Sequence, residues 1–224
     1  PANTSPAASP PTAASEESAL HRVWSDMEQG FSFIIHDAGL LFVIVALAAG
    51  MFVIGCFAPL TALYVRDTLH ASTRTFGVVS ALVGVGMVVG INVLSAFAKS
   101  VKNTALVYFG LAGIGVGLMI LAALTHLWSA FLGEFVIGFA FAAIFVPSET
   151  MIQQETPPAL LGRVGSTVMS IVFAAQIMGL VVSGILADYI GVREVFAICA
   201  ILLAILIVVG RVWMRPNGKA AAAV

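Results

Sequence analysis

The sequence predicts an all-α membrane protein with six transmembrane helices. Six stretches rich in apolar residues fill most of the chain. They occupy residues 40–65, 76–98, 104–125, 128–148, 164–187 and 195–213. Each can span a bilayer, because about 20 mostly apolar residues cross a hydrocarbon core of about 30 Å. The composition agrees, with 60% hydrophobic residues, 9% charged residues and a mean hydropathy of +1.07. Ten basic and eleven acidic residues cannot form the polar shell that a soluble protein with six buried helices would need.

Composition and motifs exclude several functions. A net charge of −1 leaves no basic patch for nucleic acid. The chain has no G-x-x-x-x-G-K-[ST] for ATP and no H-E-x-x-H for zinc, and no predicted span contains Asp for an aspartyl protease. Cys56 and Cys199 lie in different spans and are not placed for a disulfide or a metal cluster. We therefore expect no enzyme, no cofactor and no metal site.

The segments outside the spans have distinct compositions. Residues 1–20 are mainly Pro, Ala, Ser and Thr, which predicts a disordered linker. Residues 21–39 place apolar side chains at helical spacing among polar ones, which predicts an amphipathic helix in the membrane interface. We expect the membrane domain to cover residues 40–213 and a short cytoplasmic tail to follow at 214–224.

The distribution of basic residues predicts the orientation. Seven fall on one side of the predicted spans: Arg22, Lys99, Lys102, Arg163, Arg211, Arg215 and Lys219. Three fall on the other side: Arg66, Arg74 and Arg193. Because cytoplasmic loops carry an excess of Lys and Arg, we expect both termini in the cytoplasm. Trp128 and Tyr189 then lie at outer ends and Trp213 at an inner end, as interfacial aromatic residues do.

The spans contain glycine pairs and proline residues that are expected to affect helix packing and helix ends. Gly86 and Gly90 form one G-x-x-x-G pair, and Gly113 and Gly117 form another. Such pairs allow helix backbones to approach closely in lipid, although they also serve as hinges. Pro147, like Pro59, is predicted to kink or terminate its helix.

Several stretches resemble one transporter family. They are Tyr64–Leu69, Pro147–Glu149, Gln154–Ser166 and Gly184–Arg193, preceded by Gly30–Leu41. In that order they resemble parts of the seventh to twelfth helices of major facilitator superfamily exporters, and the likeness covers about residues 23–213. It is nearest to the bacterial drug and siderophore branch, the enterobactin-exporter-like group. Two features depart from the family: Leu161 stands where it usually has Arg, and Lys99 and Lys102 form only a thin basic loop.

The resemblance implies a twelve-helix fold, of which this chain supplies the C-terminal half, a 3+3 inverted repeat. The linker would match the central loop, and the missing partner would be the N-terminal half. A bacterial inner membrane and a small, mostly apolar substrate follow by the same resemblance. Gln176, near the middle of the fifth span, must find a partner and could touch substrate or tie helices together. The seventh and tenth helices, here the first and fourth spans, would line the cavity by the resemblance. Their lining residues would be Phe57, Thr61, Tyr64, Glu134, Phe141 and Phe145. The aromatic residues could equally be helix packing or lipid contacts.

Glu134 is the only acid inside a predicted span. A carboxylate at such depth costs a few kcal/mol unless it is solvated, paired or protonated. We therefore interpret Glu134 as the candidate proton-coupling residue. The alternatives are a side chain that reaches the outer interface or that pairs with a basic residue of the missing half.

Further polar residues are predicted to act as gates or ties between helices. Asn92 lies deep in the second span and must find a partner. Arg193 is expected to pair with Asp188, and Arg66 with Asp67, at helix ends. Arg163 would remain as the basic contact of the cytoplasmic loop.

The sequence thus predicts half of a proton-coupled secondary exporter that works by alternating access. The rival interpretation is a complete six-helix membrane protein, either an oligomeric channel or a non-transporting partner subunit. An upstream reading frame with six more spans would decide between them.

Overall fold

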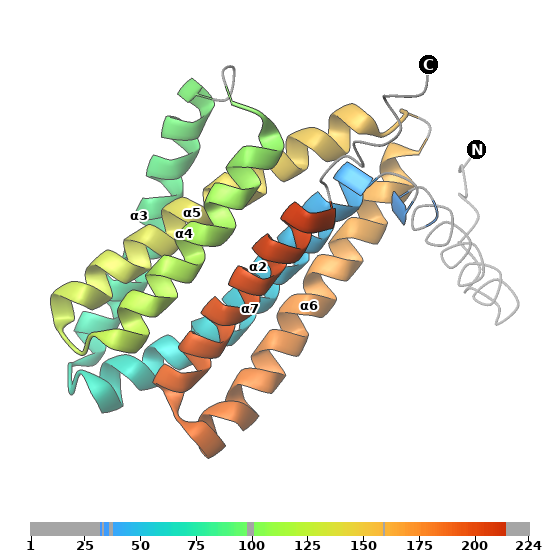
Figure 1. The fold of residues 1–224 in the computed structure, drawn as a ribbon. Coiled ribbons are helices and arrows are strands. Elements are labelled where there is room, and N and C mark those ends of the chain that lie inside the picture. The colour runs from blue at the N-terminus through green and yellow to red at the C-terminus, as the bar shows by residue number, and fades with distance from the viewer. Residues whose placement is uncertain (1–31, 33, 36–37, 98–100, 159, 214–224) are drawn as a thin grey trace, which may run out of the picture.

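The computed structural model describes residues 32, 34–35, 38–97, 101–158 and 160–213 (Figure 1). The predicted linker at 1–20, most of the predicted amphipathic segment and the tail at 214–224 lie outside the described residues, so those assignments stay predictions. The described elements are α2 (Ala38–Leu63), η1 (Tyr64–Thr68), α3 (Thr73–Phe97), α4 (Asn103–Ala123), α5 (Leu127–Glu155), α6 (Leu161–Ile190) and α7 (Val192–Trp213). Within this part of the chain, six helices are long and apolar enough to cross a membrane, which confirms the predicted class.

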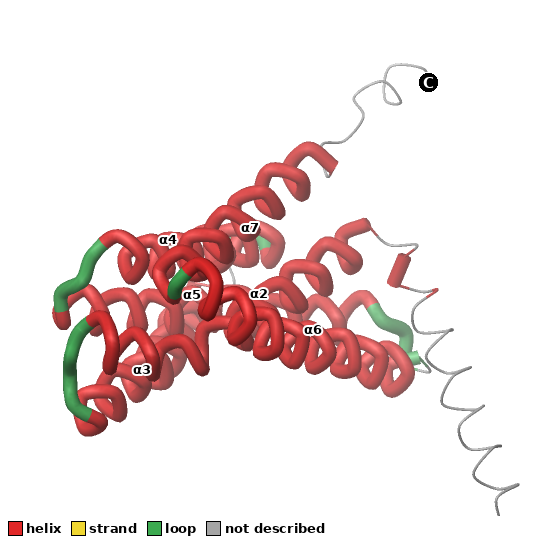
Figure 2. The backbone as a smooth tube through the Cα atoms, turned by 90° about the horizontal axis from the view of Figure 1, so that it is seen from below, coloured by secondary structure: helices red, strands yellow, loops and turns green. Residues whose placement is uncertain are grey.

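The helices form two layers (Figure 2). One layer is a row in the order α3, α5, α2, α6, in which each helix contacts its neighbours. The other layer consists of α4 and α7, which contact each other and cover one side of α5 and α2. No described helix covers the other side of the row. The row of four helices is therefore covered by α4 and α7 on one side and uncovered by described helices on the other.

The six helices form two successive groups of three, α2 to α4 and α5 to α7, and helices of one group pack against helices of the other. The first helix of each group packs along the second helix of the other: α2 along α6, and α5 along α3. Both crossings are built on glycine. Gly55 in α2 and Gly179 in α6 each lie against the backbone of the other helix, and Gly86 in α3 and Gly138 in α5 do the same. Such contacts suit a bilayer, where close van der Waals packing replaces the hydrophobic effect. This exchange of partners between the groups is consistent with the predicted 3+3 repeat.

Both predicted G-x-x-x-G pairs lie at helix contacts. Gly86 and Gly90 face the backbone of α5 from one side, and Gly113 and Gly117 face α5 from α4 on the other. A Cβ on Gly90 would come 2.8 Å from the Ala142 methyl carbon. These glycines therefore allow α3 and α4 to pack closely against opposite sides of α5.

Two helix boundaries differ from the prediction. The fourth span was expected to end at 148, but α5 continues past Pro147 to Glu155. Pro147 was expected to kink or terminate its helix. Termination was wrong, since the polar residues beyond it are still helical, and the kink stays a prediction. At the end of the first span the backbone widens into a π-helical turn, in which Leu69 N donates to Tyr64 O over 3.1 Å. Nothing in the apolar pattern signals that turn.

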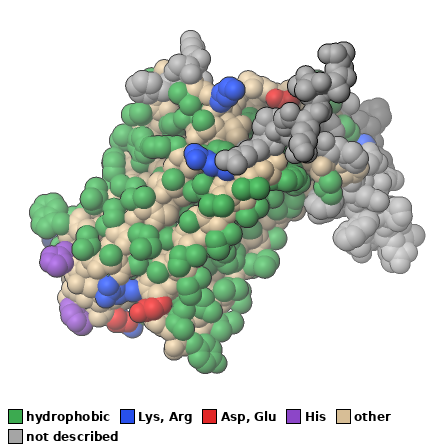
Figure 3. Space-filling model, viewed as in Figure 1, with side chains coloured by type: hydrophobic (Ala, Val, Ile, Leu, Met, Phe, Trp, Pro, Cys, Tyr) green, Lys and Arg blue, Asp and Glu red, His purple; other side chains and the backbone are tan. Residues whose placement is uncertain are grey.

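The surface matches a membrane setting. On the face shown in Figure 3, hydrophobic side chains cover the middle of the bundle and charged side chains gather at its two ends. Trp128 and Tyr189 are 82% and 84% exposed near helix ends, where interfacial aromatic residues are found.

Candidate functional site

Glu134 lies in the interior of the bundle. It sits two turns into α5 and is only 1% exposed. Its Oε2 atom has no hydrogen-bond partner among the described residues. A buried carboxyl oxygen without a partner is uncommon, because burying an unpaired polar atom costs free energy. This arrangement excludes the interpretation in which Glu134 reaches the outer interface of this chain.

One hydroxyl approaches the Glu134 carboxyl. Thr61, on α2, lies within hydrogen-bonding reach of it and is 3% exposed. Thr61 Oγ1 also donates to the Phe57 carbonyl oxygen over 3.1 Å. A hydroxyl carries one hydrogen and two acceptor sites. Thr61 can therefore accept from a protonated Glu134 while it donates to Phe57, or turn its hydrogen toward an ionised one.

The predicted lining residues of α5 lie along the seam where this helix meets α2 and α3. Gly138 lies against the Val83 backbone of α3, whereas Phe141 lies near Gly50 of α2. The rings of Phe141 and Phe145 stack with centroids 6.0 Å apart and are only partly buried. The seam belongs to the row of four helices, whose far side no described helix covers. Phe141 and Phe145 are thus placed where a cavity lining would be.

The predicted lining residues of α2 point elsewhere. Phe57 and Tyr64 are buried, and their ring centroids lie 5.7 Å and 5.8 Å from that of Phe196 in α7. Their placement as residues lining an open cavity is therefore corrected: both rings pack inside this bundle. Helical spacing shows that Phe57, Thr61 and Tyr64 share a face, but it does not show which neighbour that face meets.

Hydrogen bonds from Tyr64 and Arg193, which we call the polar clasp, join helices at one end of the bundle beside this aromatic cluster. Tyr64 Oη donates to the Leu124 carbonyl oxygen over 2.7 Å, and Arg193 Nε donates to the Ala122 carbonyl oxygen over 2.7 Å. The last carbonyl groups of a helix lack intrahelical partners, and a cation there also meets the negative end of the helix dipole. Tyr64 and Arg193 therefore cap α4 from two other helices. The predicted pair of Arg193 with Asp188 is not formed.

The remaining predicted residues have simpler surroundings. Asn92 is exposed, and its Nδ2 donates to Val88 O of its own helix over 2.7 Å. Gln176 is partly buried, and its backbone is the part that Gly55 contacts. Arg163 lies exposed in the first turn of α6. Arg66 and Asp67 form the predicted pair at 2.6 Å, with both side chains largely exposed, so it contributes little to stability.

Sequence reasoning missed a second group of buried polar atoms at the other end of α5. Ser148 Oγ, Glu149 Oε1 and Thr156 Oγ1 are all buried without a hydrogen-bond partner among the described residues. Glu149 was overlooked because the fourth span was predicted to end one residue earlier. The length of the helix beyond Pro147 was the signal that could have shown it.

The chain was compared with known proteins. The family model "Major Facilitator Superfamily" matches residues 8–223. The chain is 26% identical over 186 residues to Macrolide efflux protein A of Streptococcus pyogenes, covering 80% of this chain and 44% of that protein. It is 33% identical over 93 residues to the uncharacterized MFS-type transporter YfiS of Bacillus subtilis, covering 42% of this chain and 20% of that protein. The chain thus spans less than half the length of these relatives.

The match and the structure agree in class. The family model covers nearly the whole chain, including all six membrane-spanning helices, and two groups of three helices exchange partners across the bundle. The chain belongs to the Major Facilitator Superfamily, and it is a multi-pass membrane protein.

Proposed function

We propose that this chain is the C-terminal six-helix half of a proton-coupled exporter of small, mostly apolar molecules. Family membership points to transport rather than catalysis. The name of one relative, a macrolide efflux protein, supports export as the direction. The assignment to the enterobactin-exporter-like branch, the cytoplasmic termini and the bacterial inner membrane belong to the same proposal.

The open side of the four-helix row supports a partner half. α3 and α6 are the two outer helices of the row, and they are the least buried of the six spans. Asn92 on α3 is exposed although it lies within a span, and an amide facing lipid would be costly. A second set of six helices against this side would bury these faces and enclose the seam with Phe141 and Phe145. Access would alternate as the two halves rock against each other.

The observation that carries proton coupling is the burial of Glu134 beside Thr61, with no charged partner among the residues that the structure describes. Burial of the carboxyl group favours the neutral acid. When the seam opens and water enters, the carboxylate becomes tolerable and the proton can leave. A cationic or neutral apolar substrate would compete with the proton for the same site. Glu134 would take up its proton from outside and release it to the cytoplasm.

The experiment is reconstitution of the two halves. The chain and a matching N-terminal half are co-expressed, purified together and placed in vesicles, and proton release on addition of a macrolide is recorded. We expect release from the pair and none from the chain alone. Transport by the chain alone would favour the rival oligomer and contradict the proposal.

The Glu134→Gln variant tests the coupling site in the same vesicles. It should assemble normally but lose proton release, because an amide cannot exchange a proton, and Glu134→Asp should retain part of it. The matched control is Glu155→Gln, which changes an exposed acid at the end of the same helix and should leave release unchanged. Normal release from Glu134→Gln would place the coupling site in the other half.

A further inference from the structure

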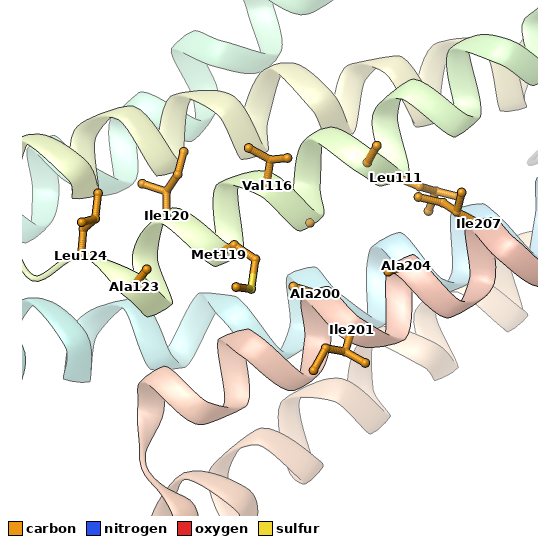
Figure 4. A pocket seen from close by; sticks show the side chains of 12 residues that line it. Leu111, Val116, Met119, Ile120, Ala123, Leu124, Ala200, Ile201, Ala204 and Ile207 are labelled. Carbon is orange, nitrogen blue, oxygen red and sulfur yellow. The ribbon is translucent and has the colours of Figure 1, made fainter.

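An apolar groove runs between α4 and α7, in the layer opposite the candidate site (Figure 4). Its volume is about 660 Å³, and all of its lining residues are apolar. On α4 the lining extends from Leu111 to Leu124, or about 20 Å at 1.5 Å per residue. That length exceeds half of a hydrocarbon core of about 30 Å. The groove is therefore longer than one leaflet of the hydrocarbon core is thick.

Small residues keep the groove open. Ala112 and Gly115 on α4 face Ala200 and Ala204 on α7. The nearest atom to a Cβ on Gly115 would be Ala200 O, at 3.8 Å, an ordinary van der Waals contact, so a methyl group would fit there without displacing α7. By contrast, the α4 glycines that face α5 have no free space beside them. The groove therefore persists because no large side chain fills it, and within a membrane its occupant must be apolar.

A cation marks one end of the groove. One turn beyond Ile207, the last lining residue of α7, lies Arg211, whose guanidinium carbon is 5.6 Å from the centre of the Tyr108 ring. Tyr108 precedes Leu111, the first lining residue of α4, by one turn and packs on Phe42 with ring centroids 4.8 Å apart. Arg211 is exposed and no described carboxylate pairs with it. Tyr108 thus holds a positive charge at the mouth of the groove that no carboxylate in the described part of the chain neutralises.

We propose that the groove binds one acyl chain of an anionic glycerophospholipid, with the lipid phosphate held by Arg211. The apolar lining suits the hydrocarbon chain, and the guanidinium suits a phosphate, which it can bind through two parallel hydrogen bonds. Lys102 is exposed at the start of α4 and adds positive charge at the same end. Basic groups at the membrane surface attract anionic lipids. The site is separate from Glu134 and does not depend on transport.

The first arm of the test measures headgroup preference. The purified chain is titrated with phosphatidylglycerol or phosphatidylcholine of identical acyl chains, and bound lipid is counted by native mass spectrometry. Phosphatidylglycerol should bind more tightly, and Arg211→Gln should weaken its binding about fivefold while leaving phosphatidylcholine unchanged. Arg74→Gln, which changes an exposed arginine at the opposite end of the bundle, is the control and should have no effect. An unchanged preference in Arg211→Gln overturns the proposal.

The second arm fills the groove. Ala204→Phe and Met119→Trp place large side chains in it, and both positions are exposed, so the fold should survive. Each should reduce retention of both lipids, whereas Ala174→Phe, at an exposed position of α6 outside the groove, should not. Unchanged retention in both groove variants overturns the proposal. So does a wild-type dimer that these variants dissociate in light scattering, because the groove would then bind a second copy.

Discussion

Tyr64 Oη donates a hydrogen bond of 2.7 Å to the Leu124 carbonyl oxygen, across 60 positions of sequence. The bond joins the end of the first span to the end of the third, where Arg193 from α7 adds two further contacts to carbonyl groups. Three helices are therefore tied together directly beside the cluster of Phe57, Tyr64 and Phe196. This clasp closes the end of the bundle nearest to Glu134.

The first prediction concerns the stability that this clasp provides. Tyr64→Phe keeps the ring against Phe196 but removes the donor to Leu124, so the free energy of unfolding should fall by about 1 kcal/mol. Unfolding is followed in mixed micelles by titration with sodium dodecyl sulfate. Tyr189→Phe is the control, since Tyr189 is 84% exposed, and it should leave the midpoint unchanged. Equal midpoints for all three proteins would show that the bond contributes nothing.

The second prediction concerns Thr61 as the partner of Glu134. Thr61→Val keeps the shape but removes the hydroxyl, so substrate-driven proton release by the reassembled transporter should slow about fivefold, the effect of losing one net hydrogen bond of about 1 kcal/mol. Thr61→Ser retains the hydroxyl and should stay close to the original rate. The measurement is the initial rate of acidification in vesicles. A valine variant as fast as the serine variant would remove Thr61 from the mechanism.

The third prediction concerns the glycine crossing between α3 and α5. Gly138→Ala would drive a methyl group into the Val83 backbone, which cannot move without separating the two helices. We expect a loss of about 1–3 kcal/mol in the free energy of unfolding, as overpacked cores show. Gly84→Ala is the matched control, because nothing lies within 4 Å of its added Cβ, and it should be neutral or slightly stabilising. The same detergent titration reads both variants, and a tolerated Gly138→Ala would mean that the crossing is loose.

The fourth prediction concerns orientation. Single cysteines at Ser72, between η1 and α3, and at Gly162, in the first turn of α6, lie at exposed positions at opposite ends of the bundle. Cys56 and Cys199 are buried and should give little background with an impermeant maleimide. In intact cells only the Ser72→Cys variant should be labelled, because the basic residues favour cytoplasmic termini. The reverse pattern would invert the topology.

Much of the fold could be predicted from the sequence. Length and hydropathy determine the six spans, because every backbone group inside a bilayer must be paired within a helix. Motif order and spacing indicated the family that the match over residues 8–223 then showed. The position of Glu134 as the single acid inside a predicted span indicated that it could be buried. The G-x-x-x-G spacing of Gly86 and Gly113 likewise indicated their close helix contacts.

The direction in which each face points was decided only by tertiary structure. Helical spacing groups Phe57, Thr61 and Tyr64 on one face, but packing against α5 and α7 turned that face inward. Arg193 was expected to meet Asp188, yet it caps α4, a helix that ends 70 positions earlier, at Ala123. Periodicity describes one helix about its own axis, whereas a site also depends on how helices rotate and cross. Only the assembled bundle sets those angles, which is why the partner of Glu134 and the groove beside Arg211 could not be foreseen.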